Sequence, residues 1–195
     1  MTTSARSMAK SDRRSQLLAA AEQLMADRGY LAVRLEDIGA AAGVSGPAIY
    51  RHFSGKEALL VELLVGISTR LLSGAQSVIA EAPDPRAALD GLIEFHLDFA
   101  LNEPDLIRIQ DRDLGNLPAA AQQQVRRAQR RYVEIWVSVL RSLNSGLAES
   151  DARVMAHAAF GLLNSTPHST KTAEQEASRE VLRAMTAAAL RRGPG

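Results

Sequence analysis

The sequence has no cysteine, few aromatic residues and almost no net charge. The absence of cysteine excludes disulfide bonds and cysteine-ligated zinc sites. Aromatic residues make up only 4% of the chain and hydrophobic residues 46%, which favours a helical core of alanine and leucine over a sheet sandwich. A formal net charge of +1 gives no sign of nucleic-acid binding by itself.

Long uninterrupted apolar runs are also lacking. No run approaches the length needed to span a bilayer, and the N-terminus has no apolar stretch typical of a signal peptide. We therefore expect a soluble, cytoplasmic protein with no membrane partner. A chain of 195 residues holds one or two compact domains.

Apolar residues recur at helical spacing, and no strand pattern or internal repeat is present. A first helix is expected over residues 11–28, after a polar tail that is either solvated or a basic arm for a DNA minor groove. Further helices are predicted at about 35–42, 46–53, 56–80, 85–102, 103–114, 118–144, 150–164 and 173–190. The chain is predicted to be all-α, with about nine helices in two domains.

The stretch after the second predicted helix carries the strongest functional signal. Gly43 can adopt the left-handed backbone that closes a helix, Ser45 is a good N-cap, and Pro47 fits the first turn of the next helix. That helix is too short to be stable alone, so Ile49 and Phe53 must anchor it to a core. Two short helices joined by a glycine-containing turn form a helix-turn-helix, whose second helix enters the DNA major groove.

The residues around this turn follow a specific order. They read Asp37-Ile38-Gly39, Ala42-Gly43-Val44-Ser45, Ile49-Tyr50-Arg51-His52-Phe53 and Gly55-Lys56-Glu57-Ala58-Leu59. This order resembles the tetracycline-repressor (TetR) family of bacterial transcriptional regulators over roughly the first third of the chain. Gly39 replaces the common alanine, Pro47 stands where glycine is usual, and Val33-Arg34 replaces the usual threonine or serine cap. Arg34 could then contact phosphate in place of that cap.

The resemblance implies a helix-turn-helix domain over residues 11–55 and a ligand-binding and dimerisation domain over residues 56–192. The implied function is a ligand-responsive regulator, a repressor in our interpretation, that binds palindromic operator DNA as a homodimer. Tyr50 and Lys56 are the implied phosphate contacts, and Arg51 is a candidate for guanine or phosphate. The full expected DNA-binding set is Arg34, Leu35, Ser45, Gly46, Pro47, Ala48, Tyr50, Arg51, His52 and Lys56. The alternative is that Tyr50 packs against the first helix and Lys56 is merely solvated.

Large apolar residues in the later helices indicate an effector site, because ligand sites are mostly apolar with few polar groups. The expected set is Phe95, Phe99, Trp136 and Phe160, with Arg108 and Asn164 at the edge. The alternative is that these aromatic residues simply fill the core. Residues 102–114 loosely resemble a branch of the family tied to acyl-coenzyme A and lipid catabolism. The resemblance thus implies an acyl-CoA or another small apolar molecule as the expected effector, and no cofactor is expected.

Several polar clusters have plainer explanations. The arginine cluster on the helix at 118–144, partly paired with Glu134, is either a solvated face or a site for a phosphate-bearing effector; it comprises Arg126, Arg127, Arg130 and Arg131. Residues 111–113 are interpreted as surface salt bridging. No compact metal set is formed by His96, His157 and His168. The alternative functions are an all-helical enzyme and a DNA-binding protein without a small-molecule input. No nucleophile–base pair supports the enzyme.

The last two predicted helices are expected to pair with their copies from a second chain as a four-helix bundle. They carry more small and apolar residues than one inner face needs, namely Ala156, Ala159, Gly161, Leu162, Val181, Leu182, Met185, Ala188 and Ala189. The alternative is that both faces are buried within a monomer.

Overall fold

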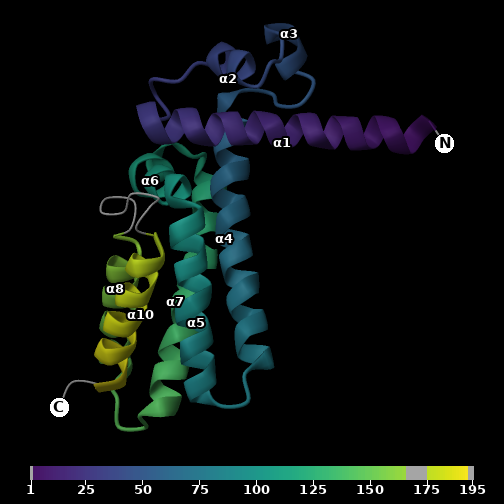
Figure 1. Cartoon of the computed structure of the whole chain (residues 1–195). Coiled ribbons are helices and arrows are strands. Elements are labelled where there is room, and N and C mark those ends of the chain that lie inside the picture. Colours follow the sequence, from purple (N-terminus) through teal and green to yellow (C-terminus); the bar gives the residue numbers. More distant parts are fainter. Residues whose placement is uncertain (1, 166–174, 193–195) are drawn as a thin grey trace. The chain divides into compact units, whose positions relative to one another are not determined.

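The computed structural model describes residues 2–165 and 175–192, and these residues form helices and turns without a strand (Figure 1). The all-α prediction is confirmed. The helices are α1 (Thr2–Arg28), α2 (Leu35–Ala41), α3 (Gly46–Ile49), α4 (Lys56–Glu81), α5 (Pro85–Asn102), α6 (Pro104–Asp113), the 3-10 helix η1 (Leu114–Asn116), α7 (Ala119–Leu143), α8 (Glu149–Leu163) and α10 (Gln175–Arg192). The polar loop expected after α8 lies almost wholly outside the described residues.

The chain folds into two compact units. The first comprises residues 1–67 and 108–123, and the second comprises residues 68–107 and 124–195. Helices α4, α6 and α7 contribute residues to both units. The first unit thus contains more of the chain than the range 11–55 that we assign to DNA binding.

Helix α1 supplies the base of the first unit. It begins at Thr2 and not at residue 11 as predicted, because no glycine or proline interrupts residues 2–28. Its apolar face is buried through Leu17, Ala21 and Met25, which have no exposed surface. This face gives the short helices that follow a core on which to pack.

Helices α2 and α3 form the predicted helix-turn-helix. Gly43 has φ 66°, the left-handed conformation expected of it. Helix α3 ends at Ile49 and not at Phe53, and the chain continues in turns in which the amides of His52 and Phe53 both donate to the Ile49 carbonyl, at 2.8 and 3.0 Å. A Cβ at Gly39 would lie 2.6 Å from Ile49 Cδ1 and 3.0 Å from the Val44 carbonyl oxygen. The close approach of α2 and α3 therefore explains glycine in place of the usual alanine.

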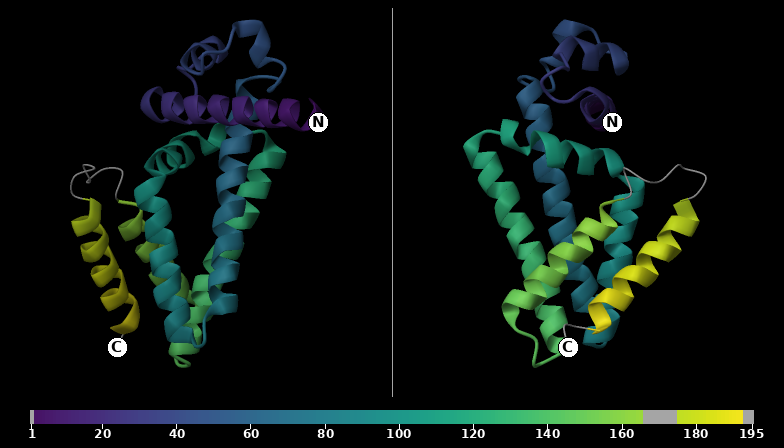
Figure 2. Two further views of the ribbon diagram at one scale, coloured as in Figure 1. Left: turned by 45° about the vertical axis from the view of Figure 1, so that its right-hand side comes forward. Right: turned by 90° about the vertical axis from the view of Figure 1, so that its left-hand side faces the viewer.

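The second unit is built around α5, which packs against α8 and α10 (Figure 2). Leu92, Leu97 and Trp136 are fully buried in its core. The contact between α4 and α5 is close at Gly74, where a Cβ would lie 2.1 Å from the Phe95 ring. Helices α8 and α10 lie side by side in both the contacts and the pictures.

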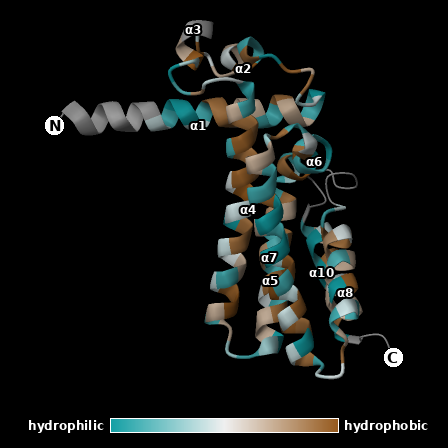
Figure 3. Ribbon diagram, turned by 180° about the vertical axis from the view of Figure 1, so that it is seen from behind, coloured by the Kyte–Doolittle hydropathy of each residue, from teal (hydrophilic) through white to brown (hydrophobic). Residues whose placement is uncertain are grey.

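Helix α4 is long and apolar enough to cross a membrane by length and composition, contrary to the expectation that no segment would be (Figure 3). Composition alone does not separate a spanning helix from a core helix. Leu59, Leu60 and Leu64 of α4 are fully buried inside the first unit, as in the core helix of a folded domain.

Candidate DNA interface and effector site

The recognition segment, which we define as residues 45–53, presents polar groups over buried apolar side chains. Ile49 and Phe53 are 1% and 3% exposed and fix the segment to the core, while Tyr50 is 60% exposed. Ser45 and Arg51 are also exposed. Ser45 occupies the N-cap of α3 as predicted, but its side chain makes no capping hydrogen bond. Tyr50, Ser45 and Arg51 are therefore available to a partner, as the helix-turn-helix prediction requires.

Arg14 of α1 positions this segment, which the sequence did not reveal. Its Nη1 donates a 2.6 Å hydrogen bond to the His52 carbonyl, and its guanidinium lies 4.1 Å from the centre of the Phe53 ring. The same guanidinium pairs with Glu62 of α4. Arg14 thereby holds the end of the recognition segment between α1 and α4.

Lys56, at the start of α4, is bonded within the protein. Its Nζ donates to the carbonyls of Tyr30 and Val33 at 2.6 and 2.7 Å, and it lies 4.3 Å from the centre of the Tyr30 ring. Since an ammonium has three donors, one N–H remains for another acceptor. Lys56 is thus not merely solvated, and its contact with the α1–α2 connection is a structural role that motif reasoning missed.

The other predicted DNA contacts differ in exposure. The Arg34 side chain is exposed at the N-cap of α2, where its backbone amide donates to Asp37 Oδ2 at 3.0 Å. The Leu35 side chain is only 8% exposed and packs in the core. Ala48 and His52 are half-buried. The surroundings of Gly46 and Pro47 lie outside what the structure describes.

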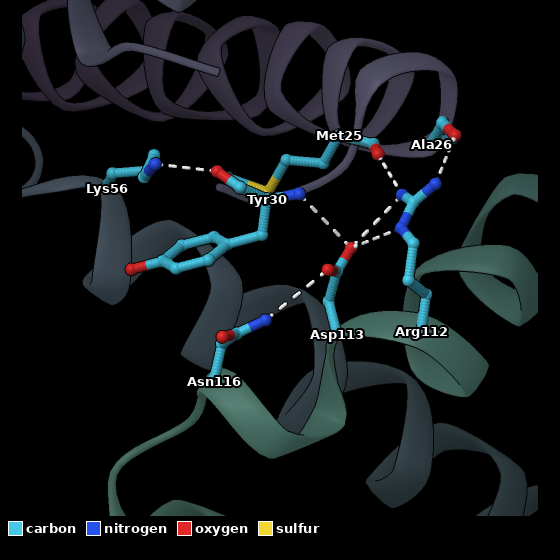
Figure 4. Close-up of polar contacts among 7 residues, drawn as sticks. All are labelled: Met25, Ala26, Tyr30, Lys56, Arg112, Asp113 and Asn116. Atoms are coloured by element: carbon cyan, nitrogen blue, oxygen red, sulfur yellow. Dashed lines mark hydrogen bonds and ion pairs between the residues drawn. The ribbon is translucent and has the colours of Figure 1, made fainter. Parts of the chain in front are cut away.

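The end of α6 is fastened to the end of α1 (Figure 4). Arg112 Nη1 donates to the Ala26 carbonyl at 3.3 Å, and its Nη2 donates to the Met25 carbonyl. Both carbonyls belong to the last turn of α1, and the Met25 carbonyl also accepts from the Gly29 amide at 2.9 Å. Asp113 Oδ2 accepts from the Tyr30 amide at 3.2 Å and from Arg112 at 3.1 Å. We call Arg112 and Asp113 the clamp.

The clamp corrects the interpretation of residues 111–113 as surface salt bridging. Asp113 is only 3% exposed, and its second oxygen accepts from Asn116 at 3.4 Å. A buried carboxylate is stable only when it is paired and hydrogen-bonded, and Asp113 meets both conditions. Asp113 and Tyr30, which follows α1, are 83 residues apart in the sequence. A local sequence pattern cannot reveal a contact over such a separation.

Four of the six predicted effector residues come together in the second unit. Phe99, Trp136 and Phe160 surround His96, with ring centres 5.9, 6.2 and 5.2 Å from its own. Asn164 Oδ1 lies 2.8 Å from His96 Nε2. Phe95 instead packs on Gly74, and Arg108 belongs to the first unit.

His96 is the centre of this cluster, a role that the sequence did not indicate. It is 3% exposed, and its Nδ1 lies 2.9 Å from the Tyr132 hydroxyl. Burial lowers the pKa of His96 to about 4, and the hydrogen bond to Asn164 offsets only part of this effect. Burial also raises the pKa of Tyr132. Both side chains are therefore neutral at physiological pH.

Two surface features remain. The arginines of the α7 cluster are exposed, and Glu134, expected to pair with them, bonds to Arg153 of α8 at 2.6 Å. On α8 and α10, exposed apolar side chains remain at Val154, Val181 and Met185. Within residues 2–165 and 175–192, no three histidine or acidic side chains are grouped to hold a metal, and His168 is outside these ranges.

A helix-turn-helix on a small helical unit, joined to a second helical unit with its own aromatic cluster, defines a DNA-binding regulator. Residues 17–63 match the bacterial regulatory proteins of the tetR family, and residues 82–192 match the tetracyclin repressor-like C-terminal domain. The chain belongs to this family, and it is a ligand-responsive transcriptional regulator.

Individual relatives agree with this assignment. The transcriptional activator FasR of Mycolicibacterium smegmatis is 34% identical over 148 residues, which are 75% of this chain and 67% of FasR. The repressor KstR2 of Mycobacterium tuberculosis is 31% identical over 142 residues, which are 70% of this chain and 68% of KstR2. The structure of FadR from Bacillus subtilis with stearoyl-CoA superimposes with a TM-score of 0.70 at 21% identity, covering 93% of this chain and 99% of FadR. This last likeness shows the shared fold.

Proposed function

We propose that the chain is a cytoplasmic repressor that binds a palindromic operator as a homodimer and is released by a small apolar or acyl-type effector. The observation that carries the DNA-binding part is the exposed face of Ser45, Tyr50 and Arg51 over the buried Ile49 and Phe53. Hydroxyl and guanidinium groups there fit phosphates and base edges. The matched relatives are named as transcriptional regulators, and the proposal assigns the chain no catalytic role.

The apolar surface of α8 and α10 supports the homodimer. Val154, Val181 and Met185 are 67%, 56% and 53% exposed. A second copy would cover them by two-fold pairing, which is the commonest symmetry of oligomers. The two recognition segments of such a dimer would read half-sites about 34 Å apart, or a multiple of that spacing.

The aromatic cluster around His96 supports the effector. FadR was solved with stearoyl-CoA, and we transfer this ligand class to the present chain as a proposal. The exposed arginines of α7 would suit the phosphates of a coenzyme A thioester, since guanidinium binds phosphate in a bidentate manner. We propose that release passes along α6, which contributes residues to both units and ends in the clamp on α1.

Selection of bound DNA fragments, followed by gel-shift titration on the selected site, tests the DNA-binding proposal. We expect a palindromic site and a loss of affinity of about tenfold or more for Tyr50→Phe, if its hydroxyl bonds a phosphate. If the remaining Lys56 donor contacts phosphate, Lys56→Ala lowers the slope of log affinity against log salt by about 1. If Lys56 acts only by holding the α1–α2 connection, affinity falls and the slope is unchanged. Recovery of no specific site would overturn the proposal.

A further inference from the structure

Three polar side chains form a continuous chain of hydrogen bonds inside the aromatic cluster. With the Asn164 oxygen facing His96, the imidazole donates from Nε2 to Asn164 at 2.8 Å, and its Nδ1 accepts from the Tyr132 hydroxyl at 2.9 Å. Phe160 stacks on the imidazole at 25° between planes, and Trp136 meets it edge-on at 89°. We call Tyr132, His96 and Asn164 the polar chain.

The polar chain leaves hydrogen-bond donors unused. The Asn164 side chain is half-buried, and among the described residues only its oxygen is bonded, so both N–H groups of its amide remain. The indole nitrogen of Trp136 is fully buried and has no partner in hydrogen-bond geometry among the described residues. Its N–H lies close enough to the Tyr132 hydroxyl to lower the pKa of Tyr132 against the effect of burial. A buried donor without an acceptor costs free energy. The Asn164 N–H groups are thus donors for which the described part of the chain supplies no acceptor.

Among the residues that the structure describes, the side chains bonded to or stacked on His96 carry no charge. His96 stays neutral, and its surroundings are aromatic. The cations that reach α5 from α10 are already paired, because Arg179 bonds Asp98 at 2.5 Å and Glu94 at 3.3 Å, and Arg183 lies 3.4 Å from Glu94. An anion buried against such a cluster would lose its hydration without gaining a counter-charge.

We propose that the polar chain is the polar end of the effector site, where the Asn164 amide donates to an uncharged carbonyl oxygen of an apolar ligand. A thioester or ester carbonyl fits this site, whereas the carboxylate of a free fatty acid does not. This inference rests on the proposed apolar or acyl-type effector and deepens it. It also assigns His96 and Tyr132 as positioning residues, since they fix the orientation of Asn164 without touching the ligand.

The test compares three ligands that share the same acyl chain and differ only in their end group. It is run at pH 8, where the free acid is ionised. The probes are the coenzyme A thioester, the methyl ester and the free acid, each with ten and with eighteen carbons. Trp136 is the single tryptophan of the chain and lies in the cluster, so its fluorescence reports binding directly. We expect the thioester and the ester to bind at least about tenfold more tightly than the acid.

Asn164→Leu removes the proposed donor at similar volume. It should weaken thioester and ester binding by about tenfold and leave the weak binding of the acid unchanged. Asn102→Leu, the same change at an exposed site of the second unit, should alter none of the three affinities. Tyr132→Phe keeps the ring and frees His96 Nδ1, and it should weaken ester binding less than Asn164→Leu does.

The outcomes separate the inference from the effector proposal. Binding of the acid as tight as that of the ester overturns the inference, and so does an equal loss for all three ligands in Asn164→Leu. If only the thioester binds, the effect of Asn164→Leu decides. Weaker thioester binding in this variant supports the inference, and unchanged thioester binding overturns it. If no ligand changes the fluorescence or releases operator DNA, the acyl effector class itself is overturned, and the inference with it.

Discussion

Removing the Asp113 carboxylate should destabilise the first unit measurably. In Asp113→Ala the Tyr30 amide loses its acceptor, and Arg112 loses the counter-charge that orients it toward the last turn of α1. An unpaired buried amide costs about 1–3 kcal/mol. Because the Arg112 side chain is 44% exposed, its ion pair adds under about 1 kcal/mol. The expected loss is therefore about 1–4 kcal/mol in the free energy of unfolding, or about 2–16 °C in Tm.

Thermal and urea unfolding followed by circular dichroism measure this loss. Asp113→Asn keeps an oxygen for Tyr30 and removes only the charge, so about 1 kcal/mol should be lost. Asp27→Ala, at an exposed carboxylate of α1, is the matched control and should change stability by less than about 0.5 kcal/mol. If Asp113→Ala is as stable as the control, the clamp does not hold α6 to α1 and the argument from its burial fails.

Three further predictions follow from buried or exposed positions in the two units. Burial lowers the pKa of His96 to about 4, whereas its pKa in the unfolded chain is about 6.5. Proton uptake by the unfolded state should therefore remove about 2 kcal/mol of stability as the pH falls from 7.5 to 5. Urea titrations should show this loss, and His96→Gln should lack it. Gly39→Ala should cost about 1–2 kcal/mol by pushing Ile49 away from α2, which thermal melts would detect. Met185→Asp should give a helical monomer in light scattering that no longer binds operator, since an unpaired charge is disfavoured in an apolar interface; a dimeric variant with normal DNA binding would show that the interface lies elsewhere.

The helix-turn-helix could be predicted because its signals are local. Gly43 must adopt a positive φ to close α2, and Ile49 and Phe53 must be buried to hold so short a helix, and the structure has both features. Helix ends were less predictable, because a polar stretch without glycine or proline is compatible with a helix as well as with an irregular tail. Residues 2–10 of α1 are the example.

The effector cluster could be predicted only in part. Large apolar residues at helical spacing identified Phe99, Trp136 and Phe160, but spacing does not distinguish a residue that faces the cluster from one that packs on a neighbouring helix. Phe95 is an example of the second kind. It packs on Gly74 of α4, where the absence of a side chain leaves room for its ring. The importance of His96 depends on Tyr132 and Asn164, which are 36 and 68 residues away, and no local pattern encodes those separations.

The size of the clamp interaction bears on how an effector acts at a distance from DNA. Couplings between two sites of a protein are typically about 1–3 kcal/mol, which changes affinity by about 5–150-fold. The clamp contributes about 1–4 kcal/mol by the terms given above, which is the same size as such a coupling. If release passes along α6, Asp113→Ala should bind operator with an affinity that the effector no longer changes. A variant that folds, binds operator and still responds fully to effector would show that the signal reaches the recognition segment by another route, for which α4 and its Lys56 contacts are the next candidates.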